Sequence, residues 1–328
     1  MDFSSLPKIE LHLHLDCSLS YEVVKQLDPS VTSQQFREEF VAGGQCHNLN
    51  DYLLRALKGI ALMQTSDQLE AVTRDLFRQL KKDGVIYAEI RFAPLQHLEN
   101  GLTAQEVVQI VDAAMEKCMA KTGVEARMIL CTLRHFNDAE SMKTVELVKE
   151  FKGTTVAGFD IAADEAGFPI DNHIAAFRYA KDHGLGITAH AGEACGPESV
   201  WETLEHFQPS RIGHGIRSIE DAKLIRFLKN YDVHLEICPT SNIKTHIYSQ
   251  LKDHPVDRIL KEGVNCSIST DGRTISDISL SHEYQNLHQN FNWGIQEFLQ
   301  CNLQAIDAAF LSEKIKIELR QEIRKAYR

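Results

Sequence analysis

The sequence lacks the features that direct a protein into a membrane or out of the cell. No apolar run approaches the roughly 18 residues that a spanning helix needs, and no basic segment followed by an apolar one opens the chain. Eight cysteines are present, but none forms a CxxC pair, and their spread is typical of buried thiols rather than of a disulfide framework. These absences predict a cytoplasmic protein that does not act at a membrane.

An excess of positive charge is also missing. Lys and Arg number 35 against 46 Asp and Glu, which leaves a net charge of −11 at pH 7. Nucleic acids and anionic membranes are bound through basic surfaces, so this balance argues against both as partners. A neutral small molecule is compatible with it. The oligomeric state is not readable from these properties.

No repeat, linker or low-complexity tract divides the chain, and 43% of its residues are hydrophobic, enough for a sizeable core. We therefore expect one domain over residues 1–328. This length exceeds that of a typical domain, but α/β barrels commonly reach about 250 residues as one unit.

Short apolar runs rich in β-branched residues alternate with helical patterns, which predicts βαβ units and a parallel sheet. Eight such strands favour a closed (β/α)8, or TIM, barrel. The expected strands are Lys8–Asp16, Ile86–Pro94, Glu125–Arg134, Thr155–Asp164, Gly186–Glu193, Arg211–Ile216, Val233–Asn242 and Asn265–Asp271. The expected helices between them are Thr103–Lys121, Ser141–Phe151, Ile170–His183, Glu198–His206 and Ile219–Asn230.

The segment between the first two strands, Tyr21–Asp83, is longer than a crossover needs. Its apolar residues at helical spacing predict extra helices over the carboxyl-end mouth of the barrel, where they would act as a lid. Ordinary helix packing explains the same stripe. The last segment, Leu280–Arg328, is expected to form terminal helices.

His12 and His14 stand two residues apart in the first strand, so both side chains point to one face of it. They lie near its carboxyl end, where the active sites of barrels open. Two imidazoles in an apolar strand are poorly explained by packing, whereas a divalent metal explains both. The alternative is one buried, hydrogen-bonded histidine and one incidental one.

His190, His214 and Asp271 each fall at or near the end of a later expected strand. Imidazoles with one carboxylate suit zinc, which would lower the pKa of a bound water to about 7 and so supply a hydroxide nucleophile. Each residue alone also fits a purely structural role at a strand end.

Glu193 follows His190 by three residues, where the strand turns into its loop. A carboxylic acid beside a metal can transfer protons if burial raises its pKa. His214 could be either a metal ligand or a partner that orients the hydroxide, and spacing does not separate these roles.

At these positions the chain resembles the adenosine deaminase family of metal-dependent amidohydrolases. The matching segments keep the family order. They are KIELHLHLD (8–16), AEIRF (88–92), DIAADE (160–165), TAHAGE (188–193), RIGHGI (211–216), LEICPTSN (235–242) and STD (269–271). HAGE and ICPTSN are specific signals, whereas HxH occurs throughout the amidohydrolases. No lysine ends the fourth strand, so one zinc is expected rather than a carbamate-bridged pair.

The resemblance implies hydrolysis of adenosine or 2′-deoxyadenosine to inosine or 2′-deoxyinosine and ammonia, in purine salvage. Glu193 would protonate the purine nitrogen next to the amino-bearing carbon, and His214 would position the zinc-bound hydroxide. Asp16 would contact the sugar 5′-hydroxyl. The implied zinc ligands are His12, His14, His190 and Asp271, and the implied apolar cover is Leu49, Tyr52 and Leu53.

Four positions depart from the family pattern. Gly272 stands where many relatives carry a second acid that meets the far ring nitrogen of the purine. Ala163 replaces a glycine whose amide faces the base, Cys17 replaces another glycine, and Ala56 falls where an aromatic cover residue is common. These changes indicate an altered pocket, unless they are neutral divergence.

Other functions stay open for this sequence. The same fold could deaminate adenine, aminodeoxyfutalosine or an N6-modified nucleotide, although no added basic cluster lies near the motifs. A zinc hydrolase of esters, amides or phosphoesters is a different class, because a barrel does not determine the reaction. A catalytically inactive binding or signalling protein is a third, but it would be expected to lose a ligand or Glu193.

Overall fold

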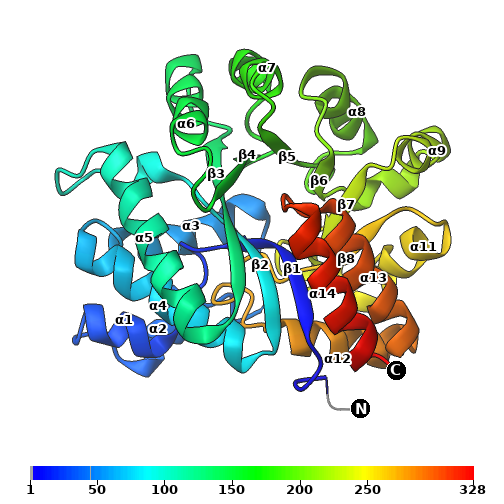
Figure 1. Ribbon diagram of the computed structural model, residues 1–328, viewed down its shortest axis with the longest axis horizontal. Coiled ribbons are helices and arrows are strands. Elements are labelled where there is room, and N and C mark those ends of the chain that lie inside the picture. The colour runs from blue at the N-terminus through cyan, green and yellow to red at the C-terminus, as the bar shows by residue number, and fades with distance from the viewer. Residues whose placement is uncertain (1–2, 45) are drawn as a thin grey trace.

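The computed structural model describes residues 3–44 and 46–328 and contains eight strands that pair in sequence order, all parallel. Helices surround these strands, so the expected (β/α)8 architecture is confirmed (Figure 1). The strands are β1 (Lys8–His14), β2 (Val85–Phe92), β3 (Glu125–Leu133), β4 (Val156–Ala162), β5 (Gly186–Ala191), β6 (Arg211–His214), β7 (His234–Ile237) and β8 (Cys266–Ile268).

The first strand and the segment after the last one bring the sheet close to closure. Leu13 and Asp271 form a parallel bridge. The His14 N–H donates to the Asp271 carbonyl at 2.8 Å, and the Asp271 N–H donates to the His12 carbonyl at 3.0 Å. Closure therefore passes through the same residues that the sequence marks as metal ligands.

The crossover helices begin and end where local chemistry predicts. In α5, the Thr103 side chain caps the first turn while Glu106 bonds back to Thr103, and Gly123 ends the helix with φ 72°. The helices between β2 and β8 are α5 (Ala104–Thr122), α6 (Asp138–Glu150), α7 (Ile174–Asp182), α8 (Pro197–His206), α9 (Ala222–Asn230), α10 (Pro239–Lys244) and α11 (Val256–Lys261). Short 3₁₀ turns cover Pro94–Gln96, Asp171–His173, Ile216–Glu220 and Leu251–Asp253.

The long segment between β1 and β2 forms four helices, α1 (Tyr21–Leu27), α2 (Ser33–Glu39), α3 (Leu49–Ala61) and α4 (Ser66–Lys82). The expected lid is one of them, α3, whose apolar face lines a cavity at the carboxyl ends of the strands. Helix α4 packs on β2 and α5 as an ordinary crossover helix.

The seventh expected strand, Val233–Asn242, was too long. The strand ends at Ile237, and Pro239 opens helix α10, because proline lacks an N–H and its fixed φ suits the first helical turn. Several other strands also end a few residues early, so Asp16, Glu193 and Asp271 lie in the loops that follow their strands.

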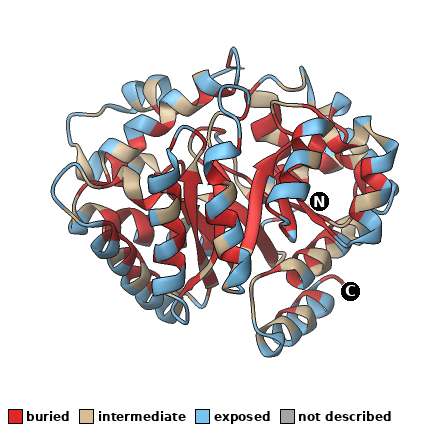
Figure 2. Ribbon diagram, turned by 90° about the horizontal axis from the view of Figure 1, so that it is seen from above, coloured by how far each residue is buried: buried red, intermediate tan, exposed pale blue. Residues whose placement is uncertain are grey.

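The C-terminal segment is helical as expected, in α12 (Leu280–Phe291), α13 (Ile295–Ala308) and α14 (Glu313–Ala326). Helix α13 packs against β1 and β8. The central strands are buried, while the helices bury one face and expose the other (Figure 2). Within the described ranges, no helix has the length and apolar character that crossing a lipid bilayer requires.

A buried acid on α12 predicts a pH-dependent stability. Glu283 accepts the Thr240 N–H at 2.9 Å, and burial raises its pKa from 4.5 to about 8. Between these two values the folded chain binds more protons than the unfolded chain. The contribution of Glu283 to the free energy of unfolding therefore falls as pH rises, by up to about 1.4 kcal/mol per pH unit.

We expect Glu283→Gln to remove this slope and to be more stable than the wild type at about pH 9. Urea unfolding at about pH 6 and about pH 9 measures the difference between the two chains. Glu146→Gln, on the exposed face of α6, is the matched control. An unchanged slope in Glu283→Gln would contradict the prediction.

Candidate active site

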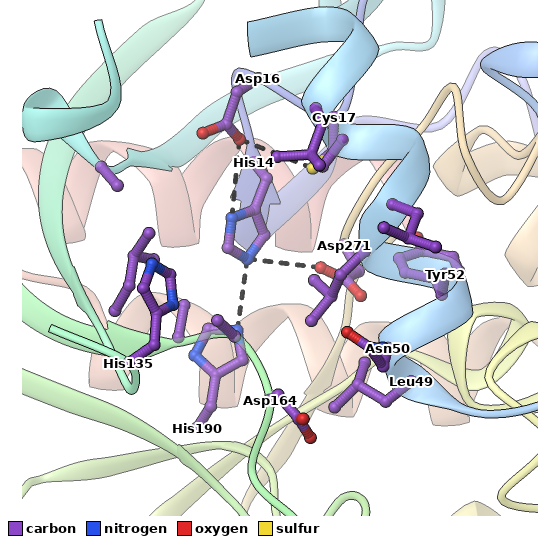
Figure 3. A pocket seen from close by; sticks show the side chains of 18 of the residues that line it. His14, Asp16, Cys17, Leu49, Asn50, Tyr52, His135, Asp164, His190 and Asp271 are labelled. Atoms are coloured by element: carbon purple, nitrogen blue, oxygen red, sulfur yellow. Dashed lines mark hydrogen bonds and ion pairs between the residues drawn. The ribbon is translucent and has the colours of Figure 1, made fainter. Parts of the chain in front are cut away.

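A cavity of about 420 Å³ opens at the carboxyl ends of the strands, beneath helix α3. Its deep wall carries polar side chains from the strand ends, and its outer wall is the apolar face of α3 (Figure 3). The deep polar residues are His14, Asp16, His190, Glu193, His214 and Asp271, and the α3 residues include Leu49, Tyr52, Leu53, Leu57 and Ile60. This is the end of a barrel at which active sites are built.

Five side chains that the sequence singled out meet at the base of this cavity. His12, His190, His214 and Asp271 each offer a ligand atom, and these atoms lie within 4.8 Å of one another. His14 joins them, with its Nε2 atom 3.2 Å from His190 Nε2 and 3.4 Å from Asp271 Oδ1. The residues come from β1, β5, β6 and the loop after β8, so only the closed barrel brings them together.

Unusual backbone conformations orient two of these side chains. His214 has φ 60° and Asp271 has φ 64°, in the left-handed region that non-glycine residues rarely occupy. Such conformations cost about 1–3 kcal/mol and persist only where the surrounding structure holds them. Asp271 is further held by Ser241 of α10, whose hydroxyl donates to Oδ2 at 2.7 Å.

A buried ion-pair network lies behind the histidines. The Nδ1 atom of His12 is 2.9 Å from Glu236 Oε2, and the Nδ1 atom of His190 is 3.1 Å from Asp160 Oδ2. The guanidinium of Arg91 donates to both carboxylates, at 2.6 Å and 2.7 Å. Sequence reasoning missed these three residues, although each is a charged residue inside a buried strand of a quoted motif.

The network determines which ring nitrogen faces the cluster. Burial alone would raise the pKa of both carboxylates, but Arg91, Arg211 and His12 hold the pKa of Glu236 below its ordinary value. His190 and Arg91 do the same for Asp160. An ionised carboxylate only accepts hydrogen bonds, so Nδ1 of His12 and of His190 carries the proton. The Nε2 lone pair of each ring is then directed into the cluster, as metal-binding histidines require.

The donor set fits a metal cation. His12 Nε2 is buried and has no hydrogen-bond partner. Burial lowers the pKa of His14, His190 and His214, which keeps these imidazoles neutral. Burial also acts to lower the pKa of His12, but contacts with Asp271 and Glu236 raise it overall. These two carboxylates favour a positive charge on or beside the His12 ring, and a metal ion supplies one as well as a proton does. Imidazole nitrogens with one carboxylate suit zinc and similar transition metals.

Glu193 lies next to this cluster, in the loop that follows β5. Its Oε2 atom is 3.5 Å from His214 Nε2, and its Oε1 atom accepts from Asn242 Nδ2 at 3.3 Å. Burial, with the nearby charges of Asp271 and Glu165, raises the pKa of Glu193 well above its ordinary value. The side chain is therefore a carboxylic acid near neutral pH and can give up a proton.

Glu165 holds the loop that carries Glu193. Its carboxylate accepts the backbone N–H groups of residues 192–195 at 2.6–3.0 Å and the Ser199 hydroxyl at 2.6 Å. Sequence analysis did not assign it a role, although it is the last residue of the DIAADE segment. A buried carboxylate with five donors determines where the loop, and thus Glu193, lies.

A chain of hydrogen bonds assigns the tautomer of His214. The Val256 N–H can only donate, at 3.2 Å to His254 Nδ1, so His254 Nε2 carries a proton that it donates to Asn242 Oδ1 at 3.2 Å. The Asn242 amide then donates to His214 Nδ1 at 3.1 Å. His214 therefore presents its Nε2–H to the cavity, as a hydrogen-bond donor.

The expected substrate contacts lie in the cavity wall with one exception. Asp16 lines the cavity, and burial raises its pKa to about 6. Ala163 lines it with φ 80°, so an alanine occupies a backbone conformation that favours glycine. Leu49, Tyr52 and Leu53 form part of the α3 cover. Gly272 is buried behind this wall rather than lining it.

Two departures from the family pattern, Cys17 and Gly272, are linked by contact. A Cβ atom added at Gly272 would lie 2.9 Å from Cys17 Cβ and 2.9 Å from the Tyr52 hydroxyl oxygen. Side chains at 17 and 272 therefore compete for one space, and Cys17 and Tyr52 occupy it here. Ala56, the fourth departure, lines the cavity from α3.

The fold and this donor set define the class of protein, a barrel hydrolase whose buried histidines and aspartate can hold a metal ion beside an acid. The family model of adenosine deaminase matches residues 7–326. The chain belongs to the adenosine deaminase family and is a hydrolytic deaminase.

Relatives named adenosine deaminase agree with this assignment, and solved structures share the fold. The chain is 35% identical over 326 residues to an adenosine deaminase of Clostridium acetobutylicum, covering 97% of each. It is 36% identical over 328 residues to one of Enterococcus faecalis, covering 98% of this chain and 97% of that one. Adenine deaminase from Arthrobacter aurescens shares the fold, with a TM-score of 0.90, 24% identity and 98% coverage of both chains. An N6-mAMP deaminase from Arabidopsis also shares the fold, with a TM-score of 0.88 and 24% identity, and the match covers 98% of this chain and 99% of that one.

The contact between positions 17 and 272 predicts non-additive stability. Gly272→Ala should lower the free energy of unfolding by about 1–3 kcal/mol, because the new methyl group meets the base of the Cys17 side chain. In a Cys17→Gly background the same change should cost less. Urea unfolding of both single variants and the double variant gives the coupling energy, expected at about 0.5–3 kcal/mol. Additive costs would show that the two positions do not compete.

Proposed function

We propose that this protein is a zinc-dependent deaminase that converts adenosine and 2′-deoxyadenosine to the corresponding inosines and ammonia. The proposal is supported by the buried Glu193, whose pKa burial raises, beside histidines and an aspartate that could hold a metal ion, in a cavity of nucleoside size.

The metal would be held by His12, His14, His190 and Asp271, one ion per chain. Their atoms converge at the base of the cavity, and Glu236 and Asp160 fix the orientation of two of the rings. Zinc, when bound, would supply a hydroxide nucleophile at neutral pH by lowering the pKa of water.

Glu193 and His214 have separate roles in the reaction. Glu193 gives its proton to the ring nitrogen next to the amino-bearing carbon, which makes that carbon electrophilic. His214 offers its Nε2–H 3.5 Å from Glu193, so it orients the attacking oxygen and is not a metal ligand. The oxygen of a water molecule then bonds to the amino-bearing carbon, its remaining proton passes to the amino group, and ammonia leaves to give the 6-oxopurine.

The charge of the cavity favours a nucleoside over a nucleotide. Asp16 and Asp164 line it and are not among the proposed metal ligands, and among the described residues that line it there is no lysine or arginine. A phosphate group beside Asp16 and Asp164 would meet carboxylates without a compensating basic side chain, which weakens binding. Asp16 instead suits a sugar hydroxyl, and the backbone N–H of Ala163 suits the base.

A second 6-aminopurine is the runner-up substrate. Free adenine is favoured by the likeness to the Arthrobacter adenine deaminase and by the lack of basic residues in the described cavity wall. An N6-modified nucleotide and aminodeoxyfutalosine are further candidate substrates, and the acidic lining disfavours the nucleotide.

An ultraviolet assay of purified protein with zinc tests the substrate. We expect adenosine and 2′-deoxyadenosine to be converted to the 6-oxopurine with a kcat/KM within the usual enzyme range of about 10⁴–10⁸ M⁻¹s⁻¹. Adenine, N6-methyl-AMP and aminodeoxyfutalosine run beside them at equal concentration. A larger kcat/KM for one of these compounds would replace adenosine as the substrate.

Glu193→Gln separates acid catalysis from metal binding. We expect this variant to keep its zinc, measured by elemental analysis, while turnover falls by roughly 10²–10⁴-fold or more because the amide has no acidic proton. Asp271→Ala is the paired variant and should lose the metal as well as activity. Near-normal turnover in Glu193→Gln would remove this residue from the mechanism.

A further inference from the structure

His254 is a buried histidine that lies outside the cavity and contacts Asn242. It is 3% exposed, and it is not among the described residues that line the cavity. Its Nδ1 atom accepts the Val256 N–H at 3.2 Å, and its Nε2 atom lies 3.2 Å from Asn242 Oδ1. The reaction uses no group of His254, so its hydrogen bond to Asn242 needs another explanation.

The amide of Asn242 contacts both candidate catalytic residues through one atom. Its Nδ2 atom donates to Glu193 Oε1 at 3.3 Å and to His214 Nδ1 at 3.1 Å. An amide nitrogen has two protons, so it can give one to each acceptor. With Glu193 protonated, the remaining protons are on Glu193 Oε2 and His214 Nε2, two atoms that lie 3.5 Å apart. Both residues line the cavity, so one amide places two donors there.

Glu193 and His214 do not by themselves determine the orientation of this amide. A half-turn of the Asn242 amide would exchange Oδ1 and Nδ2 and would present an acceptor to both partners. Burial lowers the pKa of His214 well below its ordinary value, so the ring has one proton, which would then be on Nδ1. The Nε2 lone pair would be available to a metal, because His214 belongs to the group of possible ligands whose atoms lie within 4.8 Å of one another.

His254 selects the first of these two orientations. Burial lowers the pKa of His254 to about 3, so its ring is neutral and has a single proton. Since Nδ1 accepts the Val256 N–H, this proton is on Nε2, which faces the Asn242 amide. A donor at this position is satisfied by Oδ1, whereas a flipped amide would set N–H against N–H and leave buried donors without acceptors.

We propose that Asn242 and His254 are positioning residues that hold the proton of His214 on Nε2 and so keep His214 from binding the metal. This inference rests on the proposed function, which supplies the identities of the acid and of the metal ligands. A protonated nitrogen has no lone pair to offer a cation. His214 is therefore kept as a hydrogen-bond donor beside the ion, and the ion keeps a free coordination position, as a catalytic metal site requires.

Nitrogen-15 NMR of the full-length, zinc-loaded protein with labelled histidine rings shows which ring nitrogen carries the proton. The His214 signals are identified by their absence from His214→Gln. We expect wild-type His214 to carry its proton on Nε2, with no nitrogen bound to zinc. In His254→Phe the Asn242 amide loses the donor that orients it, so we expect a form of His214 protonated on Nδ1 to appear.

Two further variants calibrate these spectra. Asn242→Asp puts a carboxylate beside His214 Nδ1, so it supplies the signal of a ring protonated on that atom. His173→Phe removes another fully buried, hydrogen-bonded histidine that is not among the described cavity residues. It is the matched control and should leave the His214 signals unchanged.

Kinetics with adenosine separate positioning from packing. In His254→Phe we expect kcat to fall roughly 10- to 100-fold, the usual effect of losing a residue that orients a group at a metal site. KM should change little, and elemental analysis should find the zinc retained, because the ligands are untouched. His254→Gln keeps an N–H donor near Asn242 and should recover most of kcat, whereas His173→Phe should leave kcat unchanged.

A wild-type His214 with its proton on Nδ1, or with a nitrogen on zinc, overturns the proposal, and this spectrum needs no variant to fold. An unchanged His214 signal in folded His254→Phe overturns it as well. Equal losses of kcat in His254→Phe and His254→Gln would show that His254 only fills space, and the proposal would fall.

The spectra are recorded without substrate, so their outcome is separable from that of the proposed function. If another 6-aminopurine is turned over in place of adenosine, that compound is used in the kinetics. Turnover of no 6-aminopurine overturns the proposed function and leaves the spectra to decide the role of His254.

Discussion

The site depends on one buried interaction, the guanidinium of Arg91 between the carboxylates of Asp160 and Glu236. These carboxylates each hold the Nδ1–H of a histidine, so the same three charges fix the rings of His190 and His12. Burying such charges is expensive, and the balance becomes favourable only when every donor and acceptor finds a partner. Here both terminal nitrogens of Arg91 donate to these carboxylates, and the oriented imidazoles present lone pairs that could hold a cation.

A second chain of contacts gives the remaining two catalytic candidates different chemical characters. Burial turns Glu193 into an acid that can give a proton, while the bonds from Val256 through His254 and Asn242 leave His214 with a proton on the atom that faces the cavity. Glu193 and His214 are adjacent and can therefore act on one substrate without exchanging roles. Enzymes commonly separate proton-transfer groups by environment in this manner.

The α3 cover and the loop after β8 adapt this general site to a particular ligand. Cys17, Tyr52 and Gly272 share one small space, so a change in any of them alters what the other two can do. Asp16 and Asp164 add carboxylates to the cavity wall, in which the described lining residues include no lysine or arginine. The cluster that could hold a metal ion thus lies at the strand ends, and the segments laid over it form the wall that a substrate would meet.

The sequence by itself determined the barrel, the position of the lid segment and the five residues that meet at the base of the cavity. Strand periodicity and the HxH and HAGE segments are local signals, so they can be read without the fold. It missed Arg91, Asp160 and Glu236, and it extended the seventh strand through Pro239 into α10, which presents Ser241 and Asn242 to the site. Those roles, and the competition between positions 17 and 272, were decided by the tertiary structure. They depend on distances between residues far apart in the chain, which exist only once the barrel has closed.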